Sequence, residues 1–217
     1  MKRKISRNVA TSVRWLSNDS NMFIETSEDL YIRAFDTRKK PFKPAVEFKV
    51  DTNFATTMDI CSEDRYIVTG HRGFDGAGCA VKLWDLRKVM AITASDNVTS
   101  EQLTEFEYTG HKFTPESVRF VKSLDTSSNS GSGVNIISAS KDATLQAIGS
   151  DGQSRSTERN SDGFACMDVL AKCPFGANNN NVDQSRIVVA ADIKQRLMVY
   201  LYDESTSILR HHPLNYD

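Results

Sequence analysis

Four residues in the second half of the chain, His111, Ser138, Ser140 and Asp142, are of the types from which nucleophilic catalysis is built. A histidine that takes a proton from a serine hydroxyl, with an aspartate behind it, is the arrangement of serine hydrolases. The local frame of such a site, a Gly-x-Ser-x-Gly turn, does not occur in the sequence. The same residue types also form buried hydrogen-bond networks, because a buried carboxylate needs donors and an imidazole supplies one. The residue types by themselves fit either role, and we single out no catalytic residue.

A glycine-rich segment, Gly70–Gly78, is the second candidate site. It lacks the Gly-Lys-Ser/Thr ending of a phosphate-binding loop, and it leads into a strand, whereas phosphate-binding loops lead into a helix. Nucleotide binding is therefore disfavoured. Because loops on rigid scaffolds often carry binding, and exposed aromatic residues are frequent anchors, we predict a protein-interaction loop between two strands. The residues expected to be presented there are His71, Arg72, Phe74 and Asp75.

A metal site is a weaker possibility. Cys166, Cys173, His211 and His212 have ligand chemistry, but no Cys-x-x-Cys or His-x-x-x-His spacing arranges them. Cys166 lies inside an apolar strand, where a free cysteine is usually a core residue. We expect no metal and no other cofactor.

Composition narrows the function further. The 217 residues are 39% hydrophobic and 25% charged, which is typical of a globular domain. Lys and Arg number 27 and Asp and Glu 28, so the balance argues against nucleic acid as a partner. A basic cluster, Lys2, Arg3, Lys4 and Arg7, is expected to be a solvated terminus. No apolar run is long enough to span a bilayer, so membrane insertion is not expected. Four scattered cysteines fit a reducing cytoplasm.

The elements that must position these residues are short strands. Apolar segments of about six residues, rich in β-branched and aromatic residues, alternate with Asn, Asp, Ser and Gly turns. No segment of 11 or more residues has a helical stripe, so we predict an all-β fold. The predicted strands are Thr11–Leu16, Asn21–Ser27, Leu30–Phe35, Ala45–Val50, Thr56–Cys61, Arg65–Thr69, Ala80–Trp84, Leu103–Tyr108, Ser117–Val121, Val134–Ser140, Ala143–Ile148, Phe164–Leu170, Arg186–Ala191, Gln195–Tyr202 and Ser205–Arg210.

These strands repeat in four rounds. The third strand of each round ends at Phe35, Trp84, Ile148 and near Val199, so the spacings are 49, 64 and about 51 residues. A plain propeller repeat takes about 40–45 residues, and polar loops account for the excess. The predicted blades cover approximately residues 8–50, 51–109, 110–160 and 161–217.

The motifs within these rounds resemble those of WD-repeat β-propellers. Leu83–Asp85 has the Trp-Asp ending of such a repeat, and Gly110-His111, followed by Ser138–Asp142, has the other half of its signature. In that family a His, a Ser or Thr, an Asp and a Trp form a hydrogen-bonded tetrad within a blade. The resemblance implies tetrad-like structural roles for His111, Ser138 or Ser140, Asp142, Trp84, Asp85, Asp29 and Asp192. Most blades retain only part of the set.

The resemblance also implies a function. WD-repeat proteins are commonly scaffolds that bind other proteins, and the insertion Gly73–Cys79 resembles a narrower group that is linked to ciliary assembly and trafficking. Two alternatives stay open: an enzyme or nucleotide-binding propeller with a pocket at the channel mouth, and a truncated product without independent function. Four blades are expected to form an open or partial ring, the C-terminal part of a larger propeller. Such a ring needs upstream blades or another chain to close it, because its end faces are apolar.

Overall fold

The computed structural model describes residues 9–39, 43–50, 53–92, 98–121, 135–170 and 185–213. These residues form four antiparallel sheets, each built from four strands that are consecutive in the chain. The predicted all-β architecture, a partial propeller of four blades, is therefore confirmed.

The strands have the following bounds. The first sheet contains β1 (Ala10–Trp15), β2 (Met22–Ser27), β3 (Tyr31–Asp36) and β4 (Val46–Lys49). The second contains β5 (Ala55–Ile60), β6 (Tyr66–His71), β7 (Val81–Asp85) and β8 (Thr104–Tyr108). The third contains β9 (Pro115–Val121), β10 (Asn135–Ser140), β11 (Thr144–Ile148) and β12 (Ser154–Arg159). The fourth contains β13 (Phe164–Leu170), β14 (Ser185–Asp192), β15 (Leu197–Asp203) and β16 (Ile208–His212).

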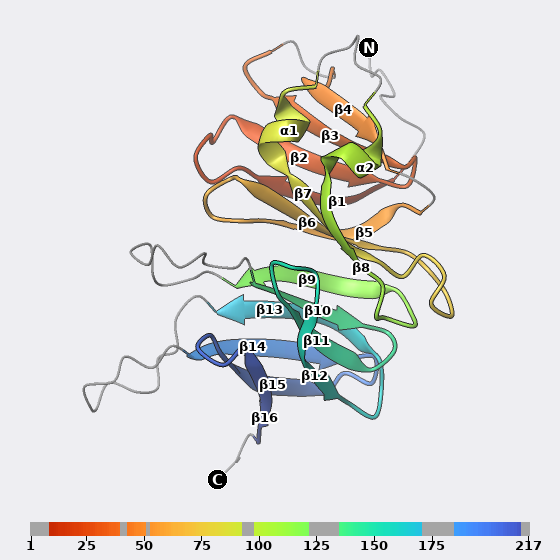
Figure 1. Cartoon of the computed structure of the whole chain (residues 1–217), viewed down its shortest axis with the longest axis vertical. Coiled ribbons are helices and arrows are strands. Elements are labelled where there is room, and N and C mark those ends of the chain that lie inside the picture. The colour runs from red at the N-terminus through yellow and green to blue at the C-terminus, as the bar shows by residue number, and fades with distance from the viewer. Residues whose placement is uncertain are drawn as a thin grey trace, which may run out of the picture.

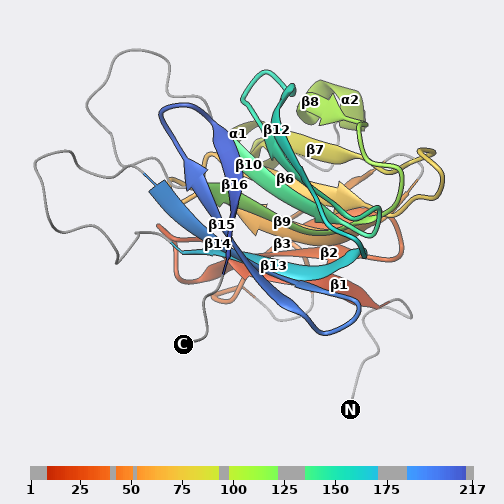
Figure 2. The ribbon, with the colours of Figure 1, turned by 90° about the horizontal axis from the view of Figure 1, so that it is seen from below.

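The sheets follow one another in chain order along the long axis of the molecule (Figure 1). The first strand of each sheet lies beside the first strand of the next, so β1, β5, β9 and β13 form the inner edge of the array. Figure 2 views the chain from the end at which the fourth sheet lies. Each pair of adjacent sheets encloses its own apolar core, centred on Met58 and Trp84, on Val68 and Val118, and on Leu145 and Tyr200.

A β-bulge at the start of each first strand puts the four sheets in a common register. The first residue of β1, β5, β9 and β13 pairs with the last residue of the following strand, and the register then shifts by one. The four last residues are Ser27, His71, Ser140 and Asp192. Because the bulge is at the same place in every sheet, side chains at equivalent positions can be compared directly.

The turns between the second and third strands are also repeated in three sheets. Leu30, Ala143 and Gln195 adopt left-handed backbone conformations, with φ of 69°, 64° and 65°, at the same place in each turn. The second sheet replaces this turn with the loop Arg72–Ala80, in which Gly76 and Gly78 have φ of 81° and 74°. Glycine adopts such positive φ values without steric cost because it has no Cβ atom.

The structure adds three elements that the sequence patterns did not predict. Strand β12 completes the third sheet, and two short helices, α1 (Leu86–Met90) and α2 (Ser100–Leu103), flank the long connection after β7. All six residues of Ser154–Arg159 are polar, so a search for apolar runs does not find this strand. The helices are too short to give a helical stripe.

Leu145 should be a strong determinant of stability, because its side chain is 0% exposed between the third and fourth sheets. Leu145→Ala removes buried methyl groups and leaves a cavity, which is expected to lower the free energy of unfolding by about 2–5 kcal/mol. Phe74→Ala, at a side chain that is 74% exposed, should change it by less than about 0.5 kcal/mol. Urea unfolding followed by circular dichroism measures both, and equal effects would contradict the assigned core.

Candidate functional site

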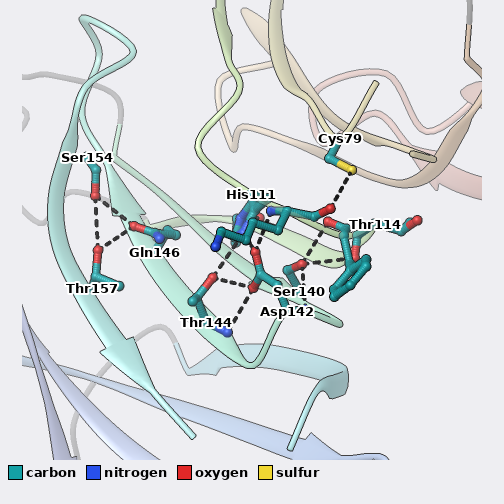
Figure 3. A network of polar contacts seen from close by, with 12 residues as sticks. Cys79, His111, Thr114, Ser140, Asp142, Thr144, Gln146, Ser154 and Thr157 are labelled. Carbon is teal, nitrogen blue, oxygen red and sulfur yellow. Dashed lines mark hydrogen bonds and ion pairs between the residues drawn. The ribbon is translucent and has the colours of Figure 1, made fainter. Parts of the chain in front are cut away.

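The predicted histidine set lies together in the third sheet, where the loop before β9, strand β10 and the turn after β10 meet; Figure 3 labels His111, Ser140 and Asp142 of this set. His111 Nε2 lies 2.9 Å from Ser138 Oγ, and His111 Nδ1 lies 3.2 Å from Asp142 Oδ2. Thr144 Oγ1, which the sequence patterns did not single out, lies 3.1 Å from the same ring nitrogen. Ser138, rather than Ser140, is therefore the hydroxyl that contacts the imidazole.

Asp142 organises the backbone around this network. Its carboxylate accepts hydrogen bonds from the backbone N–H groups of Lys112, at 2.8 Å, and Thr144, at 2.9 Å. Burial acts to raise the pKa of Asp142, but hydrogen bonds from His111 and Thr144 outweigh it and hold the pKa well below its usual range. Ser140 donates to the carbonyl of Phe113 and accepts from Asp142 N–H. These hydrogen bonds connect the loop before β9 to the turn after β10, so the role of the set is structural.

The second sheet contains a matching network that the sequence patterns missed. Trp84 Nε1 donates to Thr69 Oγ1 at 2.8 Å, and the same hydroxyl lies 2.8 Å from His71 Nε2. His71 Nδ1 lies 2.8 Å from the carbonyl oxygen of Asn53. His71 thus supplies an imidazole from the end of β6, at the position that Ser140 occupies in the third sheet.

The prediction that His71 is presented by an exposed loop is therefore wrong. Its side chain is buried, with 2% exposure, because β6 extends through residue 71 before the loop begins. The third sheet takes its histidine from the loop before β9, whereas the second takes it from β6. A spacing of two between Thr69 and His71 places both side chains on one face of a strand, and that is the signal that could have indicated the pair.

Asp85 has a different role from the one implied by the tetrad. It is the N-cap of α1, accepting from Arg87 N–H at 2.9 Å and pairing with the Arg87 guanidinium. Hydrogen bonds from Arg87 lower the pKa of Asp85. Among the described residues no side-chain hydrogen bond joins Asp85 to Trp84, so the two adjacent signature residues serve separate structures.

Asp29 and Asp192 are also bound by arginines rather than by histidine. Asp29 forms an ion pair with Arg33 at 2.6 Å and accepts from Tyr31 N–H. Asp192 ends β14, at the position equivalent to Ser140 rather than to Asp142. Burial acts to raise the pKa of Asp192, but hydrogen bonds from Arg196, among others, lower it to about 2.

The glycine-rich loop of the second sheet is fastened to the loop that precedes β9. Gly73 and Thr114 exchange two hydrogen bonds, from Gly73 N–H to the Thr114 hydroxyl at 3.2 Å and from that hydroxyl to the Gly73 carbonyl at 3.0 Å. Gly76 N–H donates to the carbonyl of Lys112, and Cys79 Sγ lies 3.3 Å from the same oxygen (Figure 3). The loop is therefore held by the adjacent blade.

The outer surface of these two loops carries a pair of aromatic rings. Phe74 is 74% exposed and Phe113 is 36% exposed, and their ring centroids are 5.4 Å apart. Arg72, also exposed, lies over the ring of Phe54, at 5.5 Å from its centroid. Asp75 is exposed, as predicted. Phe113, adjacent to the Gly110-His111 motif, was not predicted as part of this surface.

Charged residues from all four blades meet at the inner edge of the sheets. Arg14, Asp59, Arg119 and Asp168 occupy one equivalent position in β1, β5, β9 and β13, each opposite the fourth-last residue of the next strand. They border a pocket of about 420 Å³. Arg14 lies 3.6 Å from Asp59, and Arg119 lies 2.9 Å from Asp168. Burial raises the pKa of Asp59. We call this set the inner charge row.

The inner charge row is visible in the sequence once the rounds are aligned on their bulges. The four segments are Val-Arg-Trp, Met-Asp-Ile, Val-Arg-Phe and Met-Asp-Val. Without the strand register, each of these charged residues looks like an ordinary polar residue in a strand of alternating polar and apolar residues.

The metal hypothesis finds no support among the described residues. No group of three or more His, Cys, Asp or Glu side chains in the described part of the chain is placed to hold a metal ion. Cys166 is a free, exposed cysteine, so the prediction that it is a core residue is wrong. It lies on the face of β13 that points away from the third sheet. Cys173 and the basic cluster at residues 2–7 lie outside the described residues. No described helix is long and apolar enough to cross a membrane.

Two solved structures share this architecture. The structure of U3-55K matches with a TM-score of 0.64 and 11% identity, covering 95% of this chain and 52% of that chain. The WD40 repeats of RRP9 match with a TM-score of 0.65 and 13% identity, covering 95% of this chain and 51% of theirs. The fold is that of a WD40-repeat propeller. This chain spans about half the length of either structure. No protein-family model matches the chain.

Asp142 should make stability depend on pH in the acid range. Its folded pKa is depressed below the unfolded value of about 3.9, so its contribution is complete above about pH 5 and is lost as the pH falls through the folded pKa. At pH 7, Asp142→Asn should lower the free energy of unfolding on the order of 1–3 kcal/mol. The difference from wild type should shrink below about pH 4.

Urea unfolding at pH 7 and at acid pH measures this difference. Asp151→Asn is the matched control, because Asp151 is a half-exposed carboxylate that pairs with Arg155 at the surface. A constant penalty for Asp142→Asn over the whole pH range would show that the carboxylate charge does not hold the network.

Proposed function

We propose that this chain is a non-catalytic scaffold that binds another protein through the aromatic pair Phe74 and Phe113. The observation that carries the proposal is an exposed pair of large apolar rings on loops fixed by hydrogen bonds between two blades. Aromatic anchors contribute a large part of binding energy at protein interfaces. A loop that is already ordered also loses less conformational entropy on binding.

The surroundings of the pair favour a protein partner. Arg72, Asp75 and Lys112, which lie within two residues of Phe74 or Phe113 in the chain, are exposed, so charged residues of both signs accompany the apolar pair. This is the usual arrangement of a protein interface. Phosphate binding is disfavoured, since the glycine-rich loop enters β7 rather than a helix.

The pocket beside the inner charge row is the feature that an enzyme or nucleotide-binding propeller would use. Its acids are paired: Asp59 with Arg14 and with Phe120 N–H, and Asp168 with Arg119. A general acid or base needs a group that is free to exchange a proton with substrate. The scaffold is therefore the function that we favour.

The cellular setting is a further part of this proposal. The Gly73–Cys79 insertion resembles that of WD repeat-containing protein 31, and supports a cytoplasmic role in ciliary assembly or trafficking. Imaging of the tagged chain beside a basal-body marker tests this, and diffuse staining without enrichment at the marker would remove the ciliary part alone.

Replacing either ring should weaken partner binding without unfolding the chain. A photo-crosslinking amino acid that keeps an aromatic ring at position 74 should capture a partner of defined mass. Phe113→Ala should reduce the yield on the order of tenfold, because loss of a ring removes an anchor. Gel electrophoresis and mass spectrometry measure the yield.

The matched control is position 193. Ile193 is an exposed aliphatic residue, at 59%, in the turn between β14 and β15. The crosslinker at position 193 should not capture the same partner. Equal capture at positions 74 and 193, or capture at 74 that is insensitive to Phe113→Ala, would contradict the assigned surface.

A further inference from the structure

The inner charge row alternates in sign from blade to blade. Each member lies on the face of its strand that points to the following sheet, because its cross-strand partner packs there. Arg14 thus reaches Asp59 of the second blade, and Arg119 reaches Asp168 of the fourth. Asp59 accepts from Phe120 N–H at 2.9 Å. The order along the row is positive, negative, positive, negative.

Asp168 is at the end of the row. It pairs with Val189 across β13 and β14, on the face that points away from the third sheet. Its side chain is 80% exposed, compared with 19% for Asp59, which has a following sheet beside it. In the second blade Asp59 accepts from Phe120 N–H of the third, and Arg119 lies near enough to help lower the pKa of Asp59. By this repeat, a sheet placed next to the fourth would present a backbone N–H to Asp168 and have its own equivalent residue nearby. Opposite charge at that place requires a basic residue.

The end face of the first sheet exposes an apolar residue at a position that is buried in the other three sheets. Val13 is 45% exposed, whereas its equivalents Met58, Val118 and Met167 are 0%, 0% and 3% exposed. Trp15 is 56% exposed, and it contacts Phe23, which stacks on Phe35. This aromatic face lacks a preceding sheet among the described residues.

The opposite end face, on the fourth sheet, also exposes an apolar residue at a position that is buried in the other sheets. Leu197 is 56% exposed, whereas its equivalents Ile32, Val81 and Leu145 are 2%, 0% and 0% exposed. Leu170 is 49% exposed on the same side as Asp168. Exposed apolar surface of this kind is unusual on a monomer and marks an interface.

The two end faces complement each other. The first sheet offers an aromatic face, and Arg14 lies at its inner edge on the side of the second sheet. The fourth sheet offers an aliphatic face that carries Asp168 at the equivalent position. We propose that a second copy of this chain covers both faces, head to tail, so that two chains close one ring of eight sheets. In that ring Asp168 of each copy lies near Arg14 of the other.

Two considerations favour a second copy over other occupants. An alternating row of charges closes without a like-charge contact only when the number of sheets is even. Eight blades lie within the known range of about 4–8 for propellers. A head-to-tail contact that closes by two-fold rotation gives a discrete dimer rather than a filament.

The mass of the full chain in solution is the first test. Analytical ultracentrifugation at micromolar concentration should give a particle of twice 24.2 kDa that does not grow with concentration. A cooperatively melting monomer at tens of micromolar would overturn the proposal. So would open-ended oligomers, because they would show that the rotation does not close.

Charge reversal is the second test. Arg14→Asp and Asp168→Arg should each raise the dimer Kd on the order of tenfold or more, since each places like charges at both interfaces. Each also replaces an ion pair within its own chain, with Asp59 or with Arg119, and mixing does not restore that pair. An equimolar mixture of the two variants should regain dimers, because one interface then pairs the two reversed charges with each other and the other interface is native. Recovery on mixing also shows that both variants fold.

Phe74→Ala is the control that separates this proposal from the proposed function. Phe74 lies outside both end faces, so the variant should stay dimeric even when it loses its partner. Dimers that persist in both charge variants, or that fail to return on mixing, would overturn the head-to-tail pairing and leave the aromatic loop unaffected.

Discussion

Each sheet of this molecule has two apolar faces, and it must bury both against neighbouring sheets. A four-stranded blade is too thin to bury its own side chains, so its stability depends on the sheets before and after it. Met58 and Val118, with sheets on both sides, are fully buried, while Val13 at the same position of the first sheet is 45% exposed. The cores between sheets, the inner charge row and the apolar end faces all follow from this stacking.

The buried polar networks show how different residues can supply the hydrogen-bond partners of a buried histidine. In the third blade His111 comes from the loop before β9 and connects Ser138 with Asp142. In the second blade His71 comes from the end of β6 and connects Thr69 with the Asn53 carbonyl. Both arrangements give each ring nitrogen of the buried imidazole a hydrogen-bond partner, which is what burial of a polar ring demands. A blade that lacks some of the signature residues can therefore keep a buried hydrogen-bond network.

Hydrogen bonds between the second and third blades also hold the glycine-rich loop Arg72–Ala80 in place. Hydrogen bonds between Gly73 and Thr114, and from Gly76 to Lys112, tie the loop to the next blade. Phe74 and Phe113 come from separate blades, yet they form one aromatic pair. Function and stability are coupled here, because the contact that joins two blades also orients the rings.

The sequence alone determined the all-β class, the four rounds and most of the strands, because alternation, turn residues and a long repeat are local patterns. It also indicated the His111–Asp142 pair, whose residues lie in a known signature. Only the tertiary structure decided the partners of His71, Asp85 and Asp192, since these depend on strand register and on where a strand ends. The inner charge row depends on both register and stacking. Its alternation has meaning only when each sheet lies against the next, which no single stretch of sequence encodes.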